Sequence, residues 1–430
     1  MRRPKRLRSR SRLGIAAGIC ALASLLLSVV SDLAAPARAQ AGDVGQSASS
    51  SHPSALQSAL NRALLGGDLT PVRCVIDHYP EFSGVAVDSD HDVVAFSDFN
   101  LKSLLLYRRT GNVVEDGITQ PLTQIIGPDT RCETIGNVLV DPVRREVYTL
   151  NADTGDSIMA FPYSARGDAT PRTLAVPHGA FAAAINQVRK EIAVSSTAVD
   201  IVTIFRLGAT GLTHPIRYIW GAKTGLAVPW GIFWDQQHNE IGVANDGNWW
   251  EGDFGKHSAR DLNLVRLQGA QNEPRLKAEF RPPSIRIYSG LAQGDVTPLR
   301  VIQGPKTQLD WPRSIAVDTV HNLIAVANLG NNSVLIFARD ANGDVAPLRV
   351  IHGPHTEIRN PTGIAIDSRH AEIWVANFGH QGEAFDLNAQ GDVAPKRIIR
   401  NAPPGTPVVG TNSTMALGYD SKRNQLLVPN

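Results

Sequence analysis

The heptapeptide Pro312-Arg313-Ser314-Ile315-Ala316-Val317-Asp318 recurs 49 residues later as Pro361-Thr362-Gly363-Ile364-Ala365-Ile366-Asp367. Weaker copies of this motif end at Asp88, Asp141 and Asp235, and degenerate copies end at Asn186 and Asp420. Successive copies are 45 to 53 residues apart, except for one spacing of 83 residues between Asp235 and Asp318. Seven copies at a nearly constant period indicate a repeat protein.

A second motif, Gly-Asp-x-x-Pro, recurs in step with the first. It stands at 294–298, 343–347 and 391–395, with earlier copies at 67–71 and 167–171 and looser copies that end at Pro121 and Pro215. The count is again seven, so two independent motifs agree. Asp followed by Pro is ordinary turn chemistry, and we expect these aspartates on the face opposite the binding loops, without a function: Asp68, Asp168, Asp295, Asp344 and Asp392.

Each unit has room for four short strands. In the unit that begins with the heptapeptide they are expected at 314–317, 323–327, 333–338 and 347–352, which are rich in Val, Ile, Leu and aromatic residues. No unit contains a helix-length amphipathic stretch, which argues against a parallel βαβ architecture. The sequence therefore predicts an all-β fold, a seven-bladed β-propeller of four-stranded antiparallel blades.

The two ends of the chain suggest how such a ring would close. Residues 72–76 have the pattern of the last strand of a unit, and 416–419 and 425–428 have the pattern of the first two strands. The missing third strand is expected at 57–62, although this segment also has helical spacing. We therefore expect the N- and C-terminal strands to share one blade, which would remove two open sheet edges.

Residues 1–39 have the features of a secretory signal peptide. Seven basic residues between Arg2 and Arg12 precede an apolar run at 13–30 and a small-residue cleavage site, Ala37-Arg38-Ala39. We expect this segment to be removed on export to the periplasm or the medium, followed by a flexible Ser-rich leader at 40–56 and the propeller at 57–430. The alternative is an uncleaved membrane anchor, because an 18-residue run is near the lower limit for a span.

Removal of residues 1–39 changes the charge of the protein. It lowers the basic residues from 42 to 34 and the acidic residues from 40 to 39, and so turns a net charge of +2 into about −5. An acidic mature chain has no electrostatic footprint for nucleic acid, and no later apolar run is long enough to span a membrane. The two remaining cysteines, Cys74 and Cys132, are interpreted as structural, and an oxidising compartment would permit a bond between them.

The repeat resembles that of the NHL and YVTN-type bacterial propellers, including secreted lactonase-like and lyase-like members. The resemblance covers residues 67–430. It implies that the first strand of each blade lines a central channel. It also implies that the loops from strand two to three and from strand four to one share the face that carries the functional site. Fold resemblance does not identify the activity, because propellers host unrelated functions.

The long spacing contains an insertion at 246–283, which falls on this face. Long loops in compact domains are commonly functional, and paired tryptophans beside acids and a histidine suit stacking on a sugar ring or gripping of a peptide. The alternative is a lid whose tryptophans plug the channel mouth. The predicted ligand-binding residues are Trp249, Trp250, Glu251, Asp253 and His257.

A polar residue also recurs at the end of the second strand: Asp98, Asn151, Ser196, Asn245, Asn328, Asn377 and Asn430. A ring of oxygen ligands suits a hard cation, and the resemblance to gluconolactonase-type propellers implies a divalent metal held by Glu, Asn and Asp. The candidate ligands for Ca²⁺ or Zn²⁺ are Glu81, Asn245, Asn328 and Asn377, although Pro80-Glu81-Phe82-Ser83 departs from the Glu-Gly-Pro of those proteins. The alternative is that each Asn is a turn device that bonds nearby backbone.

Four histidines fall in loops of the same face: His78, His178, His355 and His380. Two or three of them together with an acid could bind zinc or act as a general base, whereas scattered surface histidines are the simpler interpretation. The sequence contains no Gly-x-Ser-x-Gly elbow, phosphate loop or cysteine metal cluster.

Two hypotheses for function follow. The first is an exported, non-enzymatic binding scaffold that holds a protein, peptide or carbohydrate ligand on the face with the insertion. The second is a metal-assisted lactonase or lyase.

Overall fold

The computed structural model describes residues 78–113, 117–250, 279–406, 418–420, 422 and 425–427. The chain divides into a unit of residues 1–73 and a unit of residues 74–430. The predicted signal peptide, the leader, the strands at 57–62 and 72–76, and Cys74 lie outside the described residues. Cys132 is buried and unbonded among the described residues, and because Cys74 lies outside them, the bond that an oxidising compartment would permit is not tested. No helix among the described residues is long and apolar enough to cross a membrane.

Six four-stranded antiparallel sheets, blades 1 to 6, make up the described fold, and each is built from strands in sequence order. Blade 1 contains β1 (Phe82–Asp88), β2 (Val93–Asp98), β3 (Ser103–Arg108) and β4 (Thr123–Ile125). Blade 2 contains β5 (Ile135–Asp141), β6 (Glu146–Asn151), β7 (Ser157–Pro162) and β8 (Arg172–Ala175). Blade 3 contains β9 (Ala180–Asn186), β10 (Glu191–Ser196), β11 (Ile201–Arg206) and β12 (Arg217–Ile219).

Blade 4 contains β13 (Pro229–Asp235), β14 (Glu240–Asn245), β17 (Ser284–Ser289) and β18 (Arg300–Ile302), with the hairpin β15 (Asn248–Trp250) and β16 (Glu279–Arg281) between β14 and β17. Blade 5 contains β19 (Pro312–Asp318), β20 (Leu323–Asn328), β21 (Ser333–Ala338) and β22 (Arg349–Ile351). Blade 6 contains β23 (Pro361–Asp367), β24 (Glu372–Asn377), β25 (Gln381–Asp386) and β26 (Arg397–Arg400). Short 3-10 helices follow several outer strands: η1 (Pro128–Thr130), η2 (Ala222–Thr224), η5 (Pro305–Thr307) and η7 (Pro354–Thr356), while η6 (Leu329–Asn331) follows β20.

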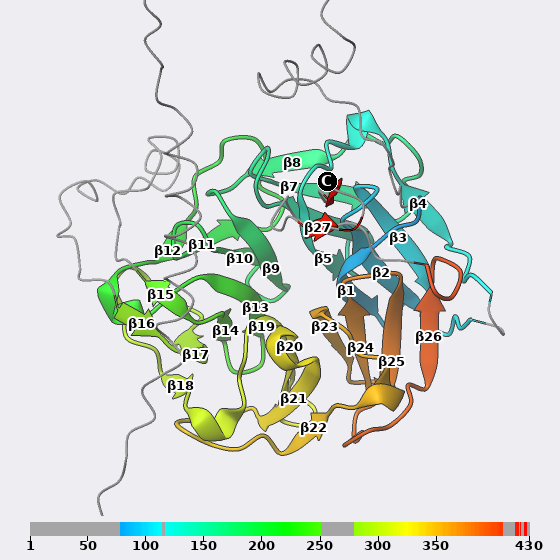
Figure 1. The fold of residues 1–430 in the computed structure, drawn as a ribbon. Helices are drawn as coiled ribbons and strands as arrows, with labels where there is room; N and C mark the ends of the chain where they lie inside the picture. The colour runs from blue at the N-terminus through cyan, green and yellow to red at the C-terminus, as the bar shows by residue number, and fades with distance from the viewer. Residues whose placement is uncertain are drawn as a thin grey trace, which may run out of the picture. The chain divides into compact units, whose positions relative to one another are not determined.

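The blades stand around a central axis with their first strands innermost, as Figure 1 shows. β1 contacts β5, β5 contacts β9, and the series continues through β13, β19 and β23 back to β1. The predicted all-β propeller of four-stranded antiparallel blades is therefore confirmed.

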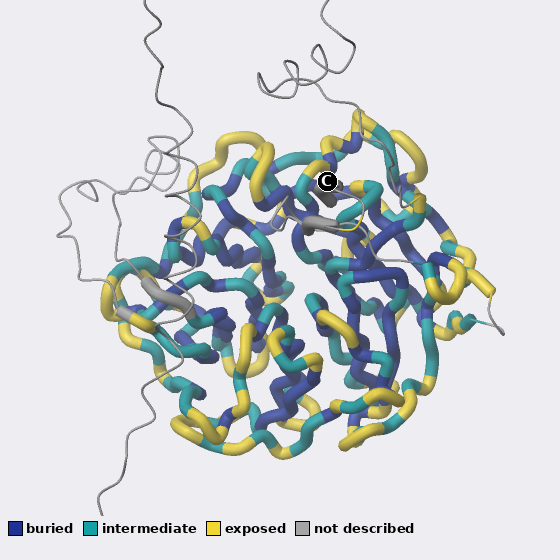
Figure 2. Tube along the Cα trace, viewed as in Figure 1, coloured by how far each residue is buried: buried dark blue, intermediate teal, exposed yellow. Residues whose placement is uncertain are grey.

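The hydrophobic core lies between the blades. The second strands β2, β10, β20 and β24 are buried at every residue, because a neighbouring blade covers each face of the sheet. Such strands are continuous apolar runs rather than alternating ones. Phe337 of blade 5, for example, packs in one cluster with Phe233 of blade 4. Figure 2 shows this buried interior with exposure confined mainly to the loops. Each such side chain contributes roughly 1.5–3 kcal/mol by leaving water.

The first strands approach one another closely at the axis. A Cβ on Gly363 of blade 6 would lie 2.8 Å from the Cα of Gly84 in blade 1, and a Cβ on Gly231 would lie 2.8 Å from the Cα of Ser314 in the next blade. The amide of Asn137 in blade 2 even donates a hydrogen bond of 3.4 Å to the hydroxyl of Ser314 in blade 5. At Gly84, Gly231 and Gly363 a larger side chain would collide with the neighbouring first strand. The first strands of the six blades are therefore closely packed around the axis.

The Gly-Asp-x-x-Pro segments latch each blade to the blade before it. Asp344 of blade 5, for example, accepts a hydrogen bond of 2.8 Å from the N–H of Lys306 in η5, and the preceding Gly343 bridges Ile302 of blade 4. Asp168, Asp295 and Asp392 bond η1, η2 and η7 in the same way. These aspartates were expected to be ordinary turn residues on the face opposite the binding loops. Instead, the described ones accept hydrogen bonds from the 3-10 helix that follows the preceding blade, and so they join two blades.

The ring closes by direct contact between blades 6 and 1, and the prediction of seven blades was wrong. The N–H of Phe82 donates to the carbonyl of Gly379 at 2.6 Å, and the N–H of Val113 donates to the carbonyl of Ile398 at 2.9 Å. No blade is shared between the chain ends within the described residues. The seventh motif copy, ending at Asp420, forms β27 (Gly418–Asp420), whose described partner is β28 (Gln425–Leu427) in a two-stranded sheet. Blade 1 takes all four strands from 82–125, so the motif count overestimated the number of blades by one.

This closure predicts that residues 78–406 form a complete ring. A chain cut to these residues is expected to fold with a β-sheet circular dichroism spectrum and to unfold cooperatively in denaturant. A chain cut to 129–406 is the control. It lacks blade 1, leaves apolar faces of blades 2 and 6 uncovered, and is expected to aggregate or remain unfolded. Failure of the 78–406 chain to fold would show that a seventh blade is needed.

Candidate functional site

The loops that follow the second and fourth strands of each blade lie at one end of the ring, here called the loop face. Antiparallel strands alternate in direction, so loops after even-numbered strands share an end. The predicted insertion begins after β14, the second strand of blade 4, and therefore leaves from this face. The loop face is also where the predicted polar ring and histidines are attached.

The recurring asparagines at the ends of the second strands are backbone clamps. In each asparagine clamp, the side-chain oxygen accepts the N–H of the residue 18 positions earlier, and the amide nitrogen donates to the carbonyl of the residue 20 positions earlier. The bonds measure 2.8 to 3.2 Å and occur at Asn151, Asn245, Asn328 and Asn377. Asp98 holds the N–H of Glu81 similarly at 2.7 Å. Each clamp fixes the loop that leads into the first strand of its own blade.

The proposed metal ligands are distributed over separate blades. Asn245, Asn328 and Asn377 belong to blades 4, 5 and 6 and are engaged as clamps, while Glu81 lies buried directly before β1. Among the described residues, no group of three or more His, Cys, Asp or Glu side chains is placed to hold an ion. The arrangement supports the turn-device interpretation of the asparagines, and a bound divalent metal stays a prediction.

The four predicted histidines do not form one site. His178 bonds Asp156 at 2.9 Å, and His355 bonds Asp392 at 2.6 Å within the latch to blade 6. His380 is buried and its Nδ1 lies 2.9 Å from the carbonyl of Pro80, and His78 is exposed.

A different histidine repeat was missed by the sequence analysis. It is Asp-x-x-His after the first strand, in which the Asp carboxylate bonds the histidine Nδ1 at 2.7 to 2.8 Å: His91, His238, His321 and His370. The fixed spacing of three residues could have indicated it. These pairs lie in the turns between the first and second strands, at the end opposite the loop face.

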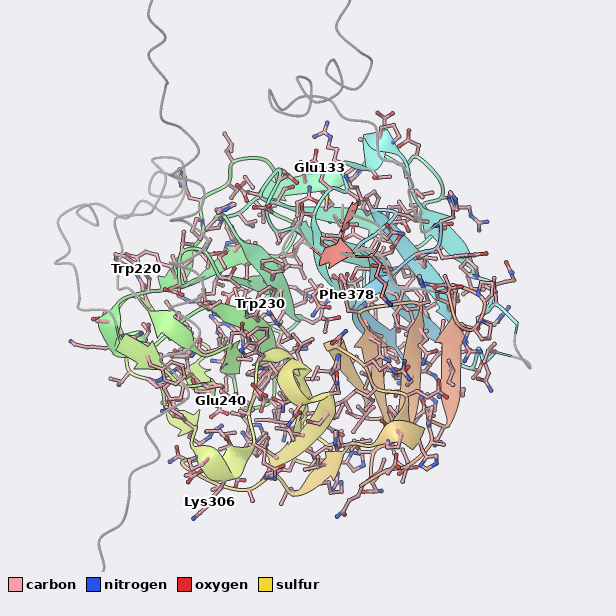
Figure 3. All side chains as sticks on the ribbon, in the orientation of Figure 1. Glu133, Trp220, Trp230, Glu240, Lys306 and Phe378 are labelled. Atoms are coloured by element: carbon pink, nitrogen blue, oxygen red, sulfur yellow. The ribbon has the colours of Figure 1, made fainter. Side chains whose placement is uncertain are left out.

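A cluster of large side chains surrounds one side of the channel mouth. The guanidinium carbon of Arg313 lies 3.8 Å from the ring centre of Trp230, and that ring lies 4.0 Å from the ring of Phe181. Arg313 also pairs with Asp246 at 3.6 Å, and half-exposed Trp311 lies 5.6 Å from the guanidinium. These five residues are the channel-mouth cluster. Figure 3 shows Trp230 close to the axis of the ring, whereas Lys306 lies at the rim.

The electrostatics of this cluster are unusual for a surface. Asp246 is only 7% exposed, and burial raises its pKa to about 6, although the charge of Arg313 and the indole of Trp230 act in the opposite direction. Burial also lowers the pKa of Arg313. The Oδ1 atom of Asp246 and the Nε1 atom of Trp230 are both buried without a hydrogen-bond partner of ordinary geometry among the described residues.

The cluster breaks the symmetry of the repeat. The second position of each first strand is occupied in turn by Ser83, Gly136, Phe181, Trp230, Arg313 and Thr362. Small or short side chains therefore meet the requirements of the fold at this position, and the large ones are confined to blades 3, 4 and 5. The signal was present in the sequence, because each of these residues lies five positions before the Asp or Asn that ends its motif copy, but the sequence analysis did not compare them.

The stem of the insertion is the hairpin of β15 and β16. Trp249 pairs with Phe280 and Trp250 pairs with Glu279 across the hairpin, and Arg281 donates a hydrogen bond of 3.2 Å to the carbonyl of Leu226, before β13. Figure 1 shows the stem toward the rim of blade 4, away from the axis. The side chains of both tryptophans, and the remaining predicted ligand residues Glu251, Asp253 and His257, lie outside the described residues.

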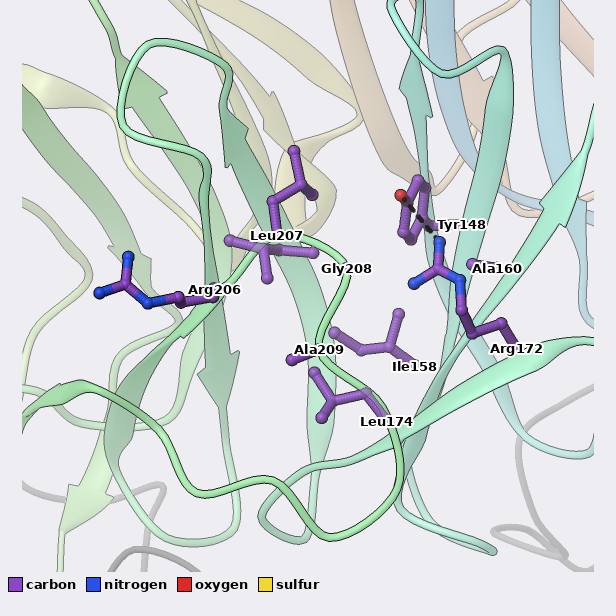
Figure 4. A pocket seen from close by; sticks show the side chains of 10 residues that line it. Tyr148, Ile158, Ala160, Arg172, Leu174, Arg206, Leu207, Gly208 and Ala209 are labelled. Atoms are coloured by element: carbon purple, nitrogen blue, oxygen red, sulfur yellow. Dashed lines mark hydrogen bonds between the residues drawn. The ribbon is translucent and has the colours of Figure 1, made fainter.

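Two cavities accompany these features. The smaller one, between blades 2 and 3 near Tyr148 and Leu207, has a volume of about 10 Å³ and has room for one water at most (Figure 4). The larger one measures about 310 Å³ and lies on the loop face of blade 6, between the β24–β25 loop and the segment that follows β26.

Comparisons with known proteins assign the chain to no family. No protein-family model matches the chain. No curated protein matches it either. Among solved structures, the chain is similar to the crystal structure of a nidogen/laminin complex, with a TM-score of 0.42 and 14% identity, over 72% of this chain and 88% of that one.

Replacement of a clamp tests its structural role. Asn328→Ala removes bonds to the backbone of Asp310 and Gln308 and is expected to lower the free energy of unfolding by about 2–3 kcal/mol, because buried backbone groups lose their partners. Denaturant unfolding measures this, with exposed Asn388→Ala as the control. If instead the purified protein holds a stoichiometric divalent ion that only Asn328→Ala loses, without a loss of stability, the metal hypothesis gains support.

The buried carboxylate of Asp246 predicts a pH effect on stability. Its pKa in the folded protein, about 6, lies above the value of roughly 4 for an unfolded chain, so the folded state binds more protons between these values. Stability therefore falls as pH rises through this window. Relative to Asp246→Asn, the wild-type free energy of unfolding is expected to fall by about 2–3 kcal/mol between about pH 4 and pH 7. Exposed Asp340→Asn should keep the wild-type pH profile, and an unchanged profile in Asp246→Asn would refute the prediction.

Proposed function

We propose that this chain is an exported binding protein, not an enzyme, and that it holds a protein, peptide or carbohydrate ligand on the loop face. The binding surface runs over blade 4, from the channel-mouth cluster to the β15–β16 hairpin. Export to the periplasm or the medium remains part of this proposal, on the basis of the basic and apolar N-terminal sequence.

One observation carries the proposal. In a ring whose other structural devices recur from blade to blade, three residues of the channel-mouth cluster, Phe181, Trp230 and Arg313, stand at a position where the other blades have Ser, Gly or Thr. Arg313 and Trp230 are therefore not required by the fold at these positions. Charged residues whose burial costs free energy, and which the fold does not require, are candidates for ligand recognition.

The chemistry of the cluster suits recognition of a partly apolar ligand with polar groups. Half-exposed Trp311 can stack on a sugar ring or a planar side chain, and aromatic and arginine residues are enriched among the residues that dominate binding energy. The carboxylate of Asp246 offers an acceptor, and the indole N–H of Trp230, which acts on that carboxylate, offers a donor. The backbone of the hairpin on the same blade carries two further tryptophans, Trp249 and Trp250.

Glycan and peptide arrays probed with the full chain test this function. A ligand found in this way is expected to bind the variants Arg313→Gln and Trp249→Ala/Trp250→Ala at least about tenfold more weakly, because each removes a central contact. Arg206→Gln is the matched control, since Arg206 is exposed at the end of β11, opposite the loop face. Wild-type affinity in both variants, with unchanged circular dichroism, would place the ligand elsewhere.

A further inference from the structure

The cavity on blade 6 is lined by charged and aromatic residues of the loop face. Its volume of about 310 Å³ falls at the lower end of the range for small-molecule pockets. Phe378 and His380 come from the β24–β25 loop, Arg359 from the loop before β23, and Arg400 from the end of β26, with Pro403 on the segment that follows. Figure 3 places Phe378 near the axis of the ring, and Figure 1 shows β26, which carries Arg400, at the rim, so the cavity extends outward over blade 6.

The two arginines of this cavity are not required by the repeat. The residue equivalent to Arg400, which follows the recurring Ile or Leu of each fourth strand, is Ile126, Ala175, Trp220, Gln303 or His352 in the other blades. The residue equivalent to Arg359, whose N–H binds an asparagine clamp, is Glu133, Ala227 or Asp310 in blades 2, 4 and 5. Both positive charges are therefore specific to blade 6.

Arg400 has few partners inside the protein. Its side chain is 14% exposed, and within the described part of the chain its guanidinium makes one ion pair, with Glu357 at 4.0 Å, and no side-chain hydrogen bond. The same oxygen of Glu357 already accepts a hydrogen bond of 2.9 Å from Gln381. A guanidinium has five N–H donors arranged to grip an oxyanion with two parallel bonds. Arg400 lines the cavity with this capacity largely unused.

A second carboxyl group, that of Glu383, lies next to the cavity and bonds two of the residues that line it. Glu383 is fully buried, and its Oε1 accepts hydrogen bonds from Asn377 at 2.7 Å and from Gln381 at 2.9 Å. Burial raises the pKa of Glu383 well above its ordinary value, which favours the neutral acid. Among the residues that line the cavity, Arg359 and Arg400 stand beside one acidic residue, Glu357. The equivalent residue in blade 5 is Leu335, so the repeat does not need an acid here either.

We propose that this cavity binds a small organic carboxylate, with the oxyanion held by Arg400 and Arg359 and the apolar part of the ligand against Phe378 and Pro403. The size of the cavity favours a small molecule over a segment of a macromolecule. The apolar wall of Phe378 and Pro403 favours an organic anion over inorganic phosphate, which has no apolar part to place against it. The site lies on blade 6 and goes beyond the function proposed for blade 4, so either proposal can fail without the other.

Calorimetric titration of the full chain with matched probes tests the site. The probes are benzoate and 3-phenylpropionate, with benzamide as the neutral analogue, phenyl phosphate as an alternative organic anion, and inorganic phosphate. Saturable binding of at least one carboxylate is expected with a dissociation constant below about 1 mM, and benzamide should bind at least about tenfold more weakly. Absence of saturable carboxylate binding, or tighter binding of either phosphate, would overturn the proposal.

Two arginine variants locate the binding. Arg400→Gln is expected to weaken carboxylate binding about 10- to 100-fold, and Arg400→Lys should retain more affinity because it keeps the charge but loses the two-bond geometry. Arg359→Gln changes an exposed side chain that the fold does not need, so it tests the site even if Arg400→Gln fails to fold. Arg206→Gln again serves as the control for loss of one positive charge. Wild-type affinity in Arg359→Gln and in folded Arg400→Gln would rule the site out.

Discussion

The approach of the first strands at the central axis is the constraint on which the rest of the structure depends. Gly84, Gly231 and Gly363 leave no room for a Cβ without movement of the neighbouring strand, and Asn137 reaches Ser314 on the opposite side of the ring. Each blade must also cover both faces of its neighbours to bury strands such as β20. A ring of six blades meets both the close approach at the axis and the burial of each sheet between its neighbours. The backbone hydrogen bonds of Phe82 and Val113 to blade 6 join the first blade to the last.

Because every blade meets the same constraint, its supporting devices repeat. The asparagine clamps hold the loop before each first strand, and the Gly-Asp latches join neighbouring blades at the rim. Where one blade has a residue that differs from its equivalents in the other blades, the shared constraint does not explain it, and a feature of that blade must. Two groups of such residues lie on the loop face, namely the aromatic and charged residues of blades 3 to 5 and the set Arg359, Arg400 and Glu383 of blade 6. The repeat thus serves as an internal reference against which recognition residues stand out.

The strands of this fold could be predicted from sequence because turn residues and apolar runs mark them locally, as at 323–327, which the structure places in β20. The number of blades could not, because the degenerate motif copy that ends at Asp420 was counted as a blade, and whether such a copy forms one depends on packing with distant segments. The two candidate sites could not be predicted from the sequence for a related reason. Arg313, Trp230 and Asp246 meet only when neighbouring blades pack, and Arg400 has no motif that points to Arg359. The asparagine ring was recognised, but the spacing to its backbone partners emerges only from the loop geometry.

Both candidate sites are built on backbone that the fold has already fixed. Asn377 clamps the carbonyl of Glu357 and also binds Glu383, so the floor of the blade 6 cavity is positioned by the same side chain that holds the loop before β23. Asn245 likewise fixes the end of β14, from which Asp246 enters the channel-mouth cluster. Ligand binding at such positions need not order the backbone, and the entropy cost of binding is correspondingly smaller. A symmetric scaffold with rigid loop anchors can therefore acquire recognition by side-chain substitution in single blades, without any change in the ring.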